Sequence, residues 1–401
     1  MPILYRYIVK ELFSPFLVIL FVFTGLLFLT KSLKLIELIA NNTASIVEVV
    51  YIFSLVIPQF LEMAIPMAFL LSIIIAIGRL SADSEIVVMR SVGLSINKLL
   101  IPLTGFSLII FSFSLIVSTW IRPASNYELG LRLFKLATAQ VSSSLISGTF
   151  NEIGPLTIYA RDTKNGGSLL KNVIISDRRN PESQRIFFAQ DAKFQSNEET
   201  RSIKMELFDG SMAEGTGSDI SQTKYSLNAI TISESELTSS NPELDRKKTS
   251  EMSTLELISN IKVTSEELKT KFSDKLKFHL SRLRVELQKR FTLPASCLCV
   301  GILSLALGIQ PSRGGSRYGI TISFITGILV ILLYYVSFAF SSAISESSGE
   351  YIEIIMWIPN LIFLALGLIV FRNISNERWS TVVDTIINSS IKLKDKFKKK
   401  S

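Results

Sequence analysis

Histidine and cysteine are nearly absent from this 401-residue chain, which has one histidine and two cysteines. With only His279, a histidine cluster for metal binding is excluded, and a Ser-His-Asp arrangement would depend on that one residue in a helical connector. We interpret His279 as a solvated helix residue. Cys297 and Cys299 lie two positions apart in an apolar run, where a helix points them to nearly opposite sides and no disulfide can close. We therefore predict no catalytic residues and no metal site in this chain.

The sequence also lacks a nucleotide-binding motif. No G-x-x-x-x-G-K-[ST] pattern occurs, which removes the usual phosphate cradle of an ATPase. The glycine-rich PSRGGSRYG at 311–319 has neither the preceding strand nor the lysine, and it is typical of a tight basic turn. We also predict no cleavable signal peptide, because Arg6, Lys10 and Glu11 lead into an apolar span without a small-residue cleavage site. We expect no cofactor here, so any work against a gradient takes its energy from another protein.

Long apolar runs are abundant, and they identify a membrane protein. The chain is 48% apolar and has a formal charge of +8, with a positive mean hydropathy. A membrane-spanning helix needs roughly 20 apolar residues. Six stretches qualify, at about 13–30, 49–77, 99–121, 291–309, 318–340 and 354–371. Three predicted spans thus lie on each side of a long polar middle.

The distribution of Lys and Arg predicts the orientation of these spans. If the N-terminus is cytoplasmic, the short outside loops hold only Lys31 and Lys34. The inside segments then hold Arg6, Lys10, Arg79, Arg90, Lys98, Arg313, Arg317 and the tail from Arg372 to Lys400. The loop SSAISESSGEYIE, with three acids and no base, agrees with an outside position. We predict that both termini are cytoplasmic, and we interpret the basic tail, 373–401, as a topology-setting end.

The middle, 123–272, is then outside, and its pattern changes to short alternating segments broken by turns. Ile203, Met205 and Leu207 alternate with polar neighbours, as half-buried strands do. Five strand candidates stand out: LTIYARD, NVIISD, RIFFAQDAKFQ, SIKMELFDGSM and KYSLNAITIS. They predict an inserted all-β domain, a small sandwich or jelly roll. The pattern becomes helical again from about Ser253, so we assign 1–122 and 273–372 to the two helical halves.

The loop between the second and third spans, RLSADSEIVVMRSVGLS, has the punctuation of a short helix. Asp83, Ser84 and Glu85 come first, an apolar group with Ile86 and Met89 follows, and Arg90 and Gly93 come last. Early acids, a late base and a final glycine predict a helix over 83–92. A helix at a membrane surface suggests a docking element.

Several stretches resemble one family. RYIVKEL, SADSEIVVMRSVGLS, LQKRFTLPASCLCVGILSLALGIQPSRGG and WIPNLIFLALG are similar to the lipopolysaccharide export permeases, the LptF/LptG family, as is the order of three spans, β domain and three spans. TKSLK and WIPN resemble the LptF branch more, but the sequence leaves the branch open. The resemblance implies an inner-membrane subunit of an ABC transporter with a periplasmic jelly-roll domain. It implies a second LptF/LptG chain, an LptB-like ATPase dimer, LptC/LptA-like jelly-roll partners and lipopolysaccharide as cargo, with no nucleic acid.

The same resemblance assigns a role to the loop helix. In the family this loop is the coupling helix, whose acidic SEI residue, here Glu85, contacts the ATPase. We therefore expect Asp83, Ser84, Glu85, Ile86, Met89 and Arg90 to form the ATPase-coupling site. The alternative is a surface helix that only connects two spans, with Glu85 solvated.

Three charged residues are candidates for substrate contact. Lys31 and Lys34 share a helical face at the outer end of the first span, where two cations suit the phosphates of lipid A. Snorkelling to lipid headgroups is the alternative interpretation. Glu62 lies inside the second span between Pro58 and Pro66, where an ionised carboxylate near mid-bilayer needs a partner or a wet cavity. We assign it to cavity lining.

Two other function classes remain open on the residues alone. A membrane-anchored periplasmic scaffold or receptor needs neither a coupling helix nor an ATPase. A secondary transporter more often has several intramembrane ionisable groups and similar halves, whereas only Glu62 stands out here. Copurification of an ATPase separates a transporter subunit from a scaffold.

Overall fold

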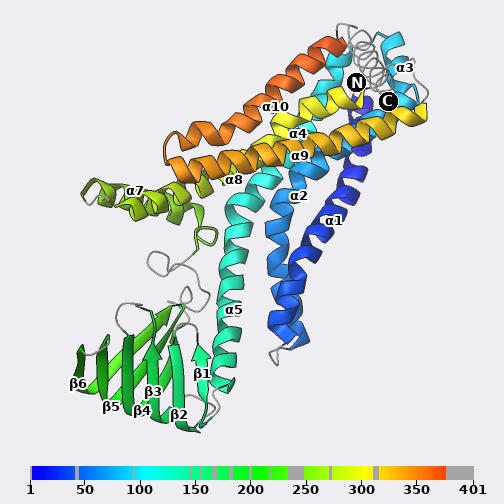
Figure 1. Ribbon diagram of the computed structural model, residues 1–401. Helices are drawn as coiled ribbons and strands as arrows, with labels where there is room; N and C mark the ends of the chain where they lie inside the picture. Colours follow the sequence, from blue (N-terminus) through cyan, green and yellow to red (C-terminus); the bar gives the residue numbers. More distant parts are fainter. Residues whose placement is uncertain are drawn as a thin grey trace, which may run out of the picture. The chain divides into compact units, whose positions relative to one another are not determined.

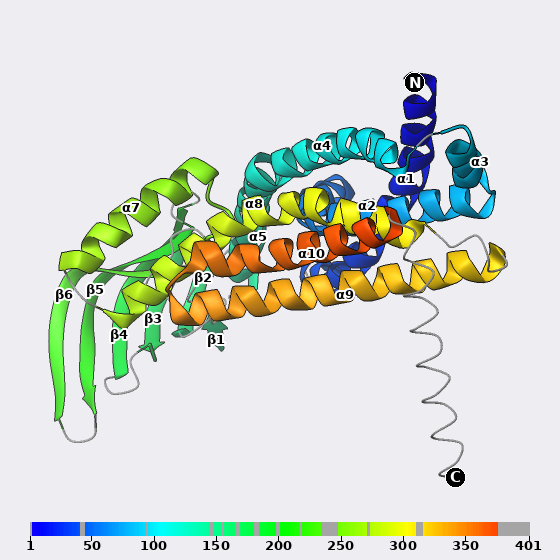
Figure 2. The same ribbon diagram turned by 90° about the horizontal axis from the view of Figure 1, so that it is seen from above.

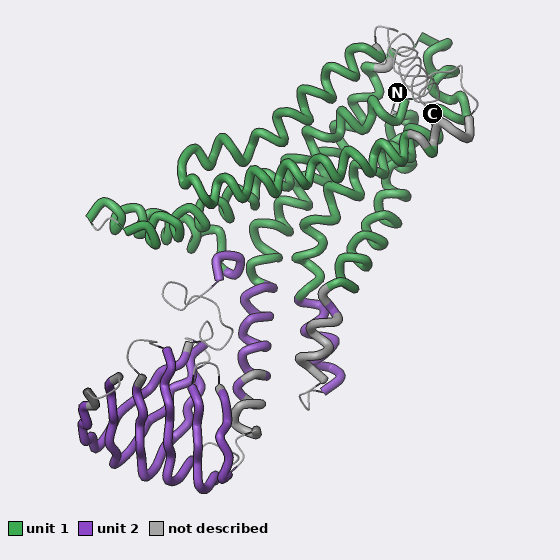
Figure 3. Tube along the Cα trace, in the orientation of Figure 1, with its two compact units in different colours: residues 1–31, 56–124, 252–401 green, residues 32–55, 125–251 purple. Residues whose placement is uncertain are grey.

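The computed structural model describes residues 2–40, 45–93, 95–144, 147–153, 156–164, 169–179, 184–197, 201–216, 219–233, 248–270, 273–309 and 316–375. The basic tail from residue 376 and the first five residues of PSRGGSRYG, 311–315, lie outside this set. The chain forms two compact units, coloured separately in Figure 3. Unit 1 comprises residues 1–31, 56–124 and 252–401, and unit 2 comprises residues 32–55 and 125–251.

All six predicted spans are confirmed as helices long and apolar enough to cross a membrane. They belong to α1 (Pro2–Ala40), α2 (Ile46–Ala82), α4 (Leu100–Ile116), α8 (Asp274–Gly308), α9 (Ser316–Ser348) and α10 (Ile352–Ser375). Most are longer than their apolar cores. The helix α2 continues through both Pro58 and Pro66, as membrane helices often do where neighbouring groups satisfy the backbone.

The third span is one continuous helical path built from four elements. A short 3-10 turn, η1 (Ile96–Leu99), leads into α4, which is followed by a π-helical turn, η2 (Val117–Ile121), and by α5 (Arg122–Ser144). Helical structure therefore runs past residue 123, where the polar middle begins in the sequence. The polar face of α5 hid this continuation, because a 20-residue apolar window ends near Ile121.

The helices of unit 1 pack closely around α2 and α8. Phe69 and Phe106 meet at 5.8 Å between ring centroids in a core that also includes Ile8 and Leu305. Figures 1 and 2 both show α8, α9 and α10 side by side. At Gly367 of α10, an added Cβ would lie 2.9 Å from the backbone nitrogen of Leu303. Glycine there lets the two helix backbones approach closely. The resulting van der Waals packing favours association in lipid, where no hydrophobic effect drives helices together.

The inserted all-β domain is confirmed as a six-stranded antiparallel sheet in unit 2. Its strands are β1 (Phe150–Ile153), β2 (Leu156–Lys164), β3 (Leu169–Asp177), β4 (Gln184–Asn197), β5 (Ser202–Thr216) and β6 (Asp219–Ser233). The five strand candidates all fall within β2–β6. Consecutive strands pair throughout, so the described strands form one meander rather than two separately connected sheets (Figure 1).

A crease crosses this sheet and explains why the alternation of its strands is interrupted. The pairing skips one residue at the same level in five neighbouring strands, at Arg161, Asn172, Gln190, Asp209 and Ser226. In β4 the buried positions accordingly change from Phe187 and Ala189 to Ala192 and Phe194. The crease keeps one apolar face turned toward a single core, which Phe134 of α5 completes.

The chain returns through two helices, as the sequence predicted for the region after Ser253. The first, α7 (Thr254–Thr270), begins with a capping box, because the Ser253 Oγ accepts from the Glu256 backbone N–H and Glu256 accepts from the Ser253 N–H in return. The second, α8, carries the chain into the fourth span. This reciprocal cap fixes where the returning chain becomes helical.

Candidate functional site

The predicted coupling helix is present as α3 (Glu85–Ser91), shorter than the 83–92 expected. Asp83 precedes it, and Ser84 adopts a left-handed conformation with φ of 61°. At the other end Gly93 has φ of +83°, a conformation that glycine adopts without strain and that commonly ends a helix. The start and stop residues recognised in the sequence thus bound a helix that is shorter than expected at each end.

The inner face of α3 packs against other helices of unit 1. Ile86 is buried and Met89 half-buried, and they contact a core that includes Leu4 and Ile8 of α1 and Leu99. Full burial of a side chain such as Ile86 contributes roughly 1.5–3 kcal/mol. Ile86 and Met89 therefore hold the helix on the end of the membrane bundle, which is a structural role.

The outer side of α3 exposes three valines beside Arg90 and Ser91. Val87 is 49% exposed, Val88 61% and Val92 77%. Three valines on a seven-residue helix and its cap are more than a solvated connector needs, and such patches mark interaction sites. This face, which we call the valine face (Val87, Val88 and Val92), can dock another protein.

Glu85 is held at the edge of α3 by a tyrosine from the first helix. The Tyr7 hydroxyl lies 3.1 Å from both Glu85 carboxylate oxygens and donates to them. A second contact between helices lies nearby, since Arg79 pairs with Glu11 at 3.6 Å, with the Arg79 side chain 68% exposed. Exposed pairs of this kind contribute little to stability, typically below about 1 kcal/mol. The Tyr7 contact orients Glu85 and leaves its carboxylate with spare acceptor capacity.

The predicted phosphate-contacting lysines lie in α1, whose helix runs through Lys31 and Lys34. Their side chains lie outside what the structure describes. Their pairing on one face remains a prediction from the helical spacing of three.

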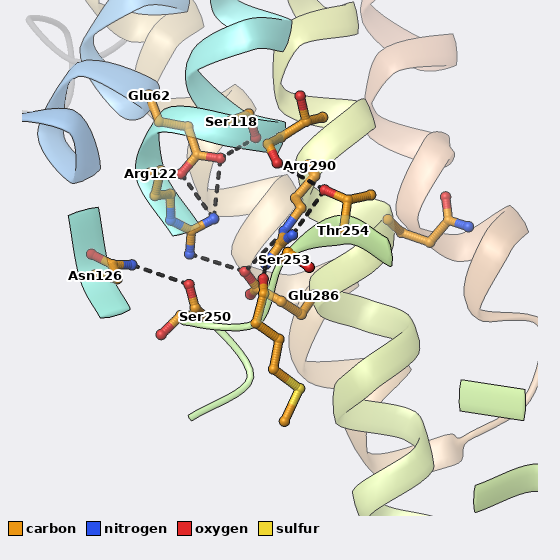
Figure 4. Close-up of polar contacts among 12 residues, drawn as sticks. Glu62, Ser118, Arg122, Asn126, Ser250, Ser253, Thr254, Glu286 and Arg290 are labelled. Atoms are coloured by element: carbon orange, nitrogen blue, oxygen red, sulfur yellow. Dashed lines mark hydrogen bonds and ion pairs between the residues drawn. The ribbon is translucent and has the colours of Figure 1, made fainter. Parts of the chain in front are cut away.

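Glu62 is buried, with 3% of its surface exposed, and it belongs to a network between helices shown in Figure 4. The Ser118 hydroxyl donates to its carboxylate, and Arg122 pairs with it at 3.1 Å. The other arm of Arg122 reaches Glu286 at 3.1 Å. The partner that the sequence led us to expect for Glu62 is therefore a protein cation, Arg122.

Arg290 completes this group, which we call the buried polar network (Glu62, Arg122, Glu286 and Arg290). Its side chain is fully buried, and its Nε lies 3.7 Å from Glu286. Its two terminal nitrogens donate to the Met252 carbonyl at 2.7 Å and to the Thr254 hydroxyl at 3.0 Å. Two acids and two bases make the network neutral overall, which reduces the cost of its burial.

The network joins residues at the borders of two predicted spans, because Arg122 follows the third span and Arg290 precedes the fourth. Along α2, Glu62 is about 30 Å from Ala82 at the α3 end, taking about 1.5 Å per residue. That distance is about the thickness of a bilayer's hydrocarbon core.

Sequence reasoning missed Arg122, Glu286 and Arg290. Arg122 looked like the polar end of a span, and the other two looked like charges of a connecting helix. The available signal was the spacing of four between Glu286 and Arg290, which places them on one face of a helix entering the membrane. The described residues contain no group of three or more His, Cys, Asp or Glu side chains arranged to hold a metal ion.

Comparison with known families adds the deciding observation. A profile described as lipopolysaccharide export system permease LptF/LptG matches residues 6–373. The chain belongs to this family. The match spans the helical halves and the β insertion together.

Three relatives share limited sequence identity with the chain. LptF of Escherichia coli is 22% identical over 391 residues, covering 95% of this chain and 96% of that protein. LptG of Haemophilus influenzae is 31% identical over 121 residues, which is 30% of this chain and 34% of that protein. An uncharacterised protein of Rickettsia prowazekii is 24% identical over 188 residues, or 47% of this chain and 52% of that protein. The match thus covers about half of the Rickettsia protein and a third of the Haemophilus protein.

Proposed function

We propose that the chain is a permease subunit of an ABC transporter that extracts lipopolysaccharide from the inner membrane and passes it to a periplasmic jelly-roll bridge. Its partners are an LptB-like ATPase dimer, a second LptF/LptG-type chain and LptC/LptA-like proteins. Both termini are cytoplasmic and the β domain is periplasmic, as the distribution of Lys and Arg in the short loops supports. ATP is bound by the partner, because this sequence has no phosphate-binding loop.

The observation that carries the proposal is the construction of α3. Its inner face is anchored by Ile86, while the valine face is left exposed at the end of α2 that leads into α3. A subunit without its own motor needs a contact of this kind, through which force arrives. Family membership supports the same assignment. Glu85, oriented by Tyr7, is then the charged residue at the rim of the docking surface.

The proposal is tested by Glu85→Ala in proteoliposomes containing the reconstituted complex, with lipopolysaccharide transport and ATP hydrolysis measured in the same vesicles. We expect transport to fall more than hydrolysis, because losing one rim charge costs a few kcal/mol at most, so assembly persists while coupling weakens. Asp162→Ala, on an exposed residue of β2, serves as a matched acid-to-alanine control in the β domain. Wild-type transport by Glu85→Ala would refute the docking role.

Copurification of the wild-type chain tests the scaffold alternative. A transporter subunit brings down a nucleotide-binding ATPase from its own membranes, whereas a scaffold or receptor with a periplasmic β domain does not. Recovery of the chain without any ATPase would favour a scaffold or receptor function over a transport function.

A further inference from the structure

The buried polar network joins the chain where it leaves the membrane helices to where it returns. Figure 4 shows Arg122 between Glu62 and Glu286, with Arg290 reaching the returning segment. We propose that this network is a positioning joint that holds both crossings in fixed register during transport, with Arg122 and Arg290 as its positioning residues. The proposal rests on the proposed function and adds to it a residue set that transmits movement.

Four segments converge at the joint. Glu62 comes from α2, Ser118 and Arg122 from the third span, and Glu286 and Arg290 from α8. The fourth segment is the return, 252–254. It is held twice, because Arg290 donates to the Met252 carbonyl and the Thr254 hydroxyl donates to the Thr119 carbonyl at 2.8 Å. Outgoing and returning chain are thus connected directly.

The π-helical turn η2 is part of this construction. It contributes the Ser118 hydroxyl to Glu62 and the Thr119 carbonyl to Thr254, and Arg122 follows it immediately. A π turn inserts an extra residue into a helix, and such turns frequently lie at functional sites. The distortion of the third span therefore coincides with the contacts that fix the two crossings.

The bonds of the network restrict sliding of the helices. Arg122 contacts carboxylates of both α2 and α8 at 3.1 Å, whereas one helical turn is about 5.4 Å. A displacement of α2 against α8 by a fraction of a turn must break or exchange these bonds. A movement that starts at the α3 end of α2 is thereby passed to α8 and to the returning segment.

Stability alone does not explain the network. Replacing a buried set of charges by apolar side chains is often neutral or stabilising. In this network, moreover, the Nε atoms of Arg122 and Arg290 are buried and donate no hydrogen bond to any residue that the structure describes. An arrangement chosen for stability would satisfy these donors or omit them, so the geometry of the contacts is what the network provides.

The first experiment removes one pair without leaving an unbalanced charge. Glu62→Gln combined with Arg122→Met leaves Glu286 and Arg290 to pair with each other and keeps side-chain volumes similar. In the reconstituted complex we expect transport to fall about ten-fold, while ATP hydrolysis and the melting temperature stay near wild type. Transport within two-fold of wild type, in a folded chain, would overturn the proposal.

The matched control makes the same two changes in an exposed pair, Glu128→Gln with Arg132→Met, whose side chains are 34% and 36% exposed. It should transport like wild type. Equal losses in both double variants would show a general effect of removing charge and would also overturn the proposal.

A second variant tests the proposal if the first double variant does not accumulate in the membrane. Arg290→Lys keeps the charge but cannot donate to Met252 and Thr254 through a planar fork. We expect amide hydrogen exchange across 250–257 to rise about ten-fold in the full chain in nanodiscs. Unchanged exchange would overturn the joint. Hydrogen exchange does not depend on transport. A wild-type complex that fails to move lipopolysaccharide would therefore refute the proposed function, while the exchange measurement would still test the proposed joint.

Discussion

Within unit 1, α3 and the buried polar network place their charged and apolar residues in opposite ways. In α3 the charged residues lie at the surface and the apolar valine face is uncovered. In the network the charges are buried and apolar helices surround them. A surface helix offers binding to another molecule at little cost to its own fold, whereas a buried network fixes geometry inside the molecule. In our two proposals, the same residue types, Glu and Arg, contact a partner protein in α3 and fix the register of helices in the network.

The largest expected difference between the regions is in stability. Arg122→Ala leaves Glu62 and Glu286 buried without the cation between them, and removing one partner of a buried pair costs about 3–5 kcal/mol. Arg79→Ala removes a pair whose arginine is 68% exposed, and it should cost less than about 1 kcal/mol. Unfolding of both variants in the same detergent measures the difference. Equal costs would contradict the contrast between a buried and a surface region.

The second expected difference lies within α3, between its two faces. Ile86→Ala should destabilise the local structure by about 2–5 kcal/mol because it opens a cavity beneath the helix, and hydrogen exchange across 85–91 should rise. Val88→Ala should leave exchange unchanged, since the side chain is 61% exposed, and should weaken ATPase binding. Titration of the purified ATPase against both variants measures that loss. Faster hydrogen exchange in Val88→Ala than in Ile86→Ala would mean that the inner and outer faces of α3 are assigned the wrong way round.

Tyr7→Phe should have the smallest effect. It removes one hydroxyl that donates to Glu85 at 3.1 Å and changes no packing volume. Because the contact is exposed, stability should change by less than about 0.5 kcal/mol. Transport per ATP should fall, but by less than in Glu85→Ala, since the carboxylate remains. A Tyr7→Phe loss as large as that of Glu85→Ala would mean that the tyrosine itself contacts the ATPase.

Much of the architecture was predictable because its signals are local. Six apolar runs, five alternating segments and the order Asp83, Glu85, Arg90, Gly93 each report on a stretch of neighbouring residues. The structure has a helix or strand at every one of these places. The single crease of the sheet was not predictable, because it appears only when five strands are aligned side by side.

The buried polar network was not predictable for the same reason. Glu62 and Arg122 are 60 positions apart, and neither the span pattern nor the charge count pairs them. A lone carboxylate in an apolar run predicts that a partner exists, but only the packing of α2 against the third span identifies it. The continuation of helix through residue 123 had also been hidden, because α5 is too polar for a span and too helical for a strand.

Photocrosslinking from the valine face tests the central claim, that α3 docks a separate ATPase, most directly. A photoreactive amino acid at Val88, irradiated in intact membranes, should give one major adduct with a nucleotide-binding ATPase. The same probe at Leu29 of α1, which is 66% exposed on a membrane-spanning helix, should give none with that protein. ATPase adducts from Val88 alone would establish the docking site. An expressed, folded chain with no ATPase adduct from Val88 would contradict the account.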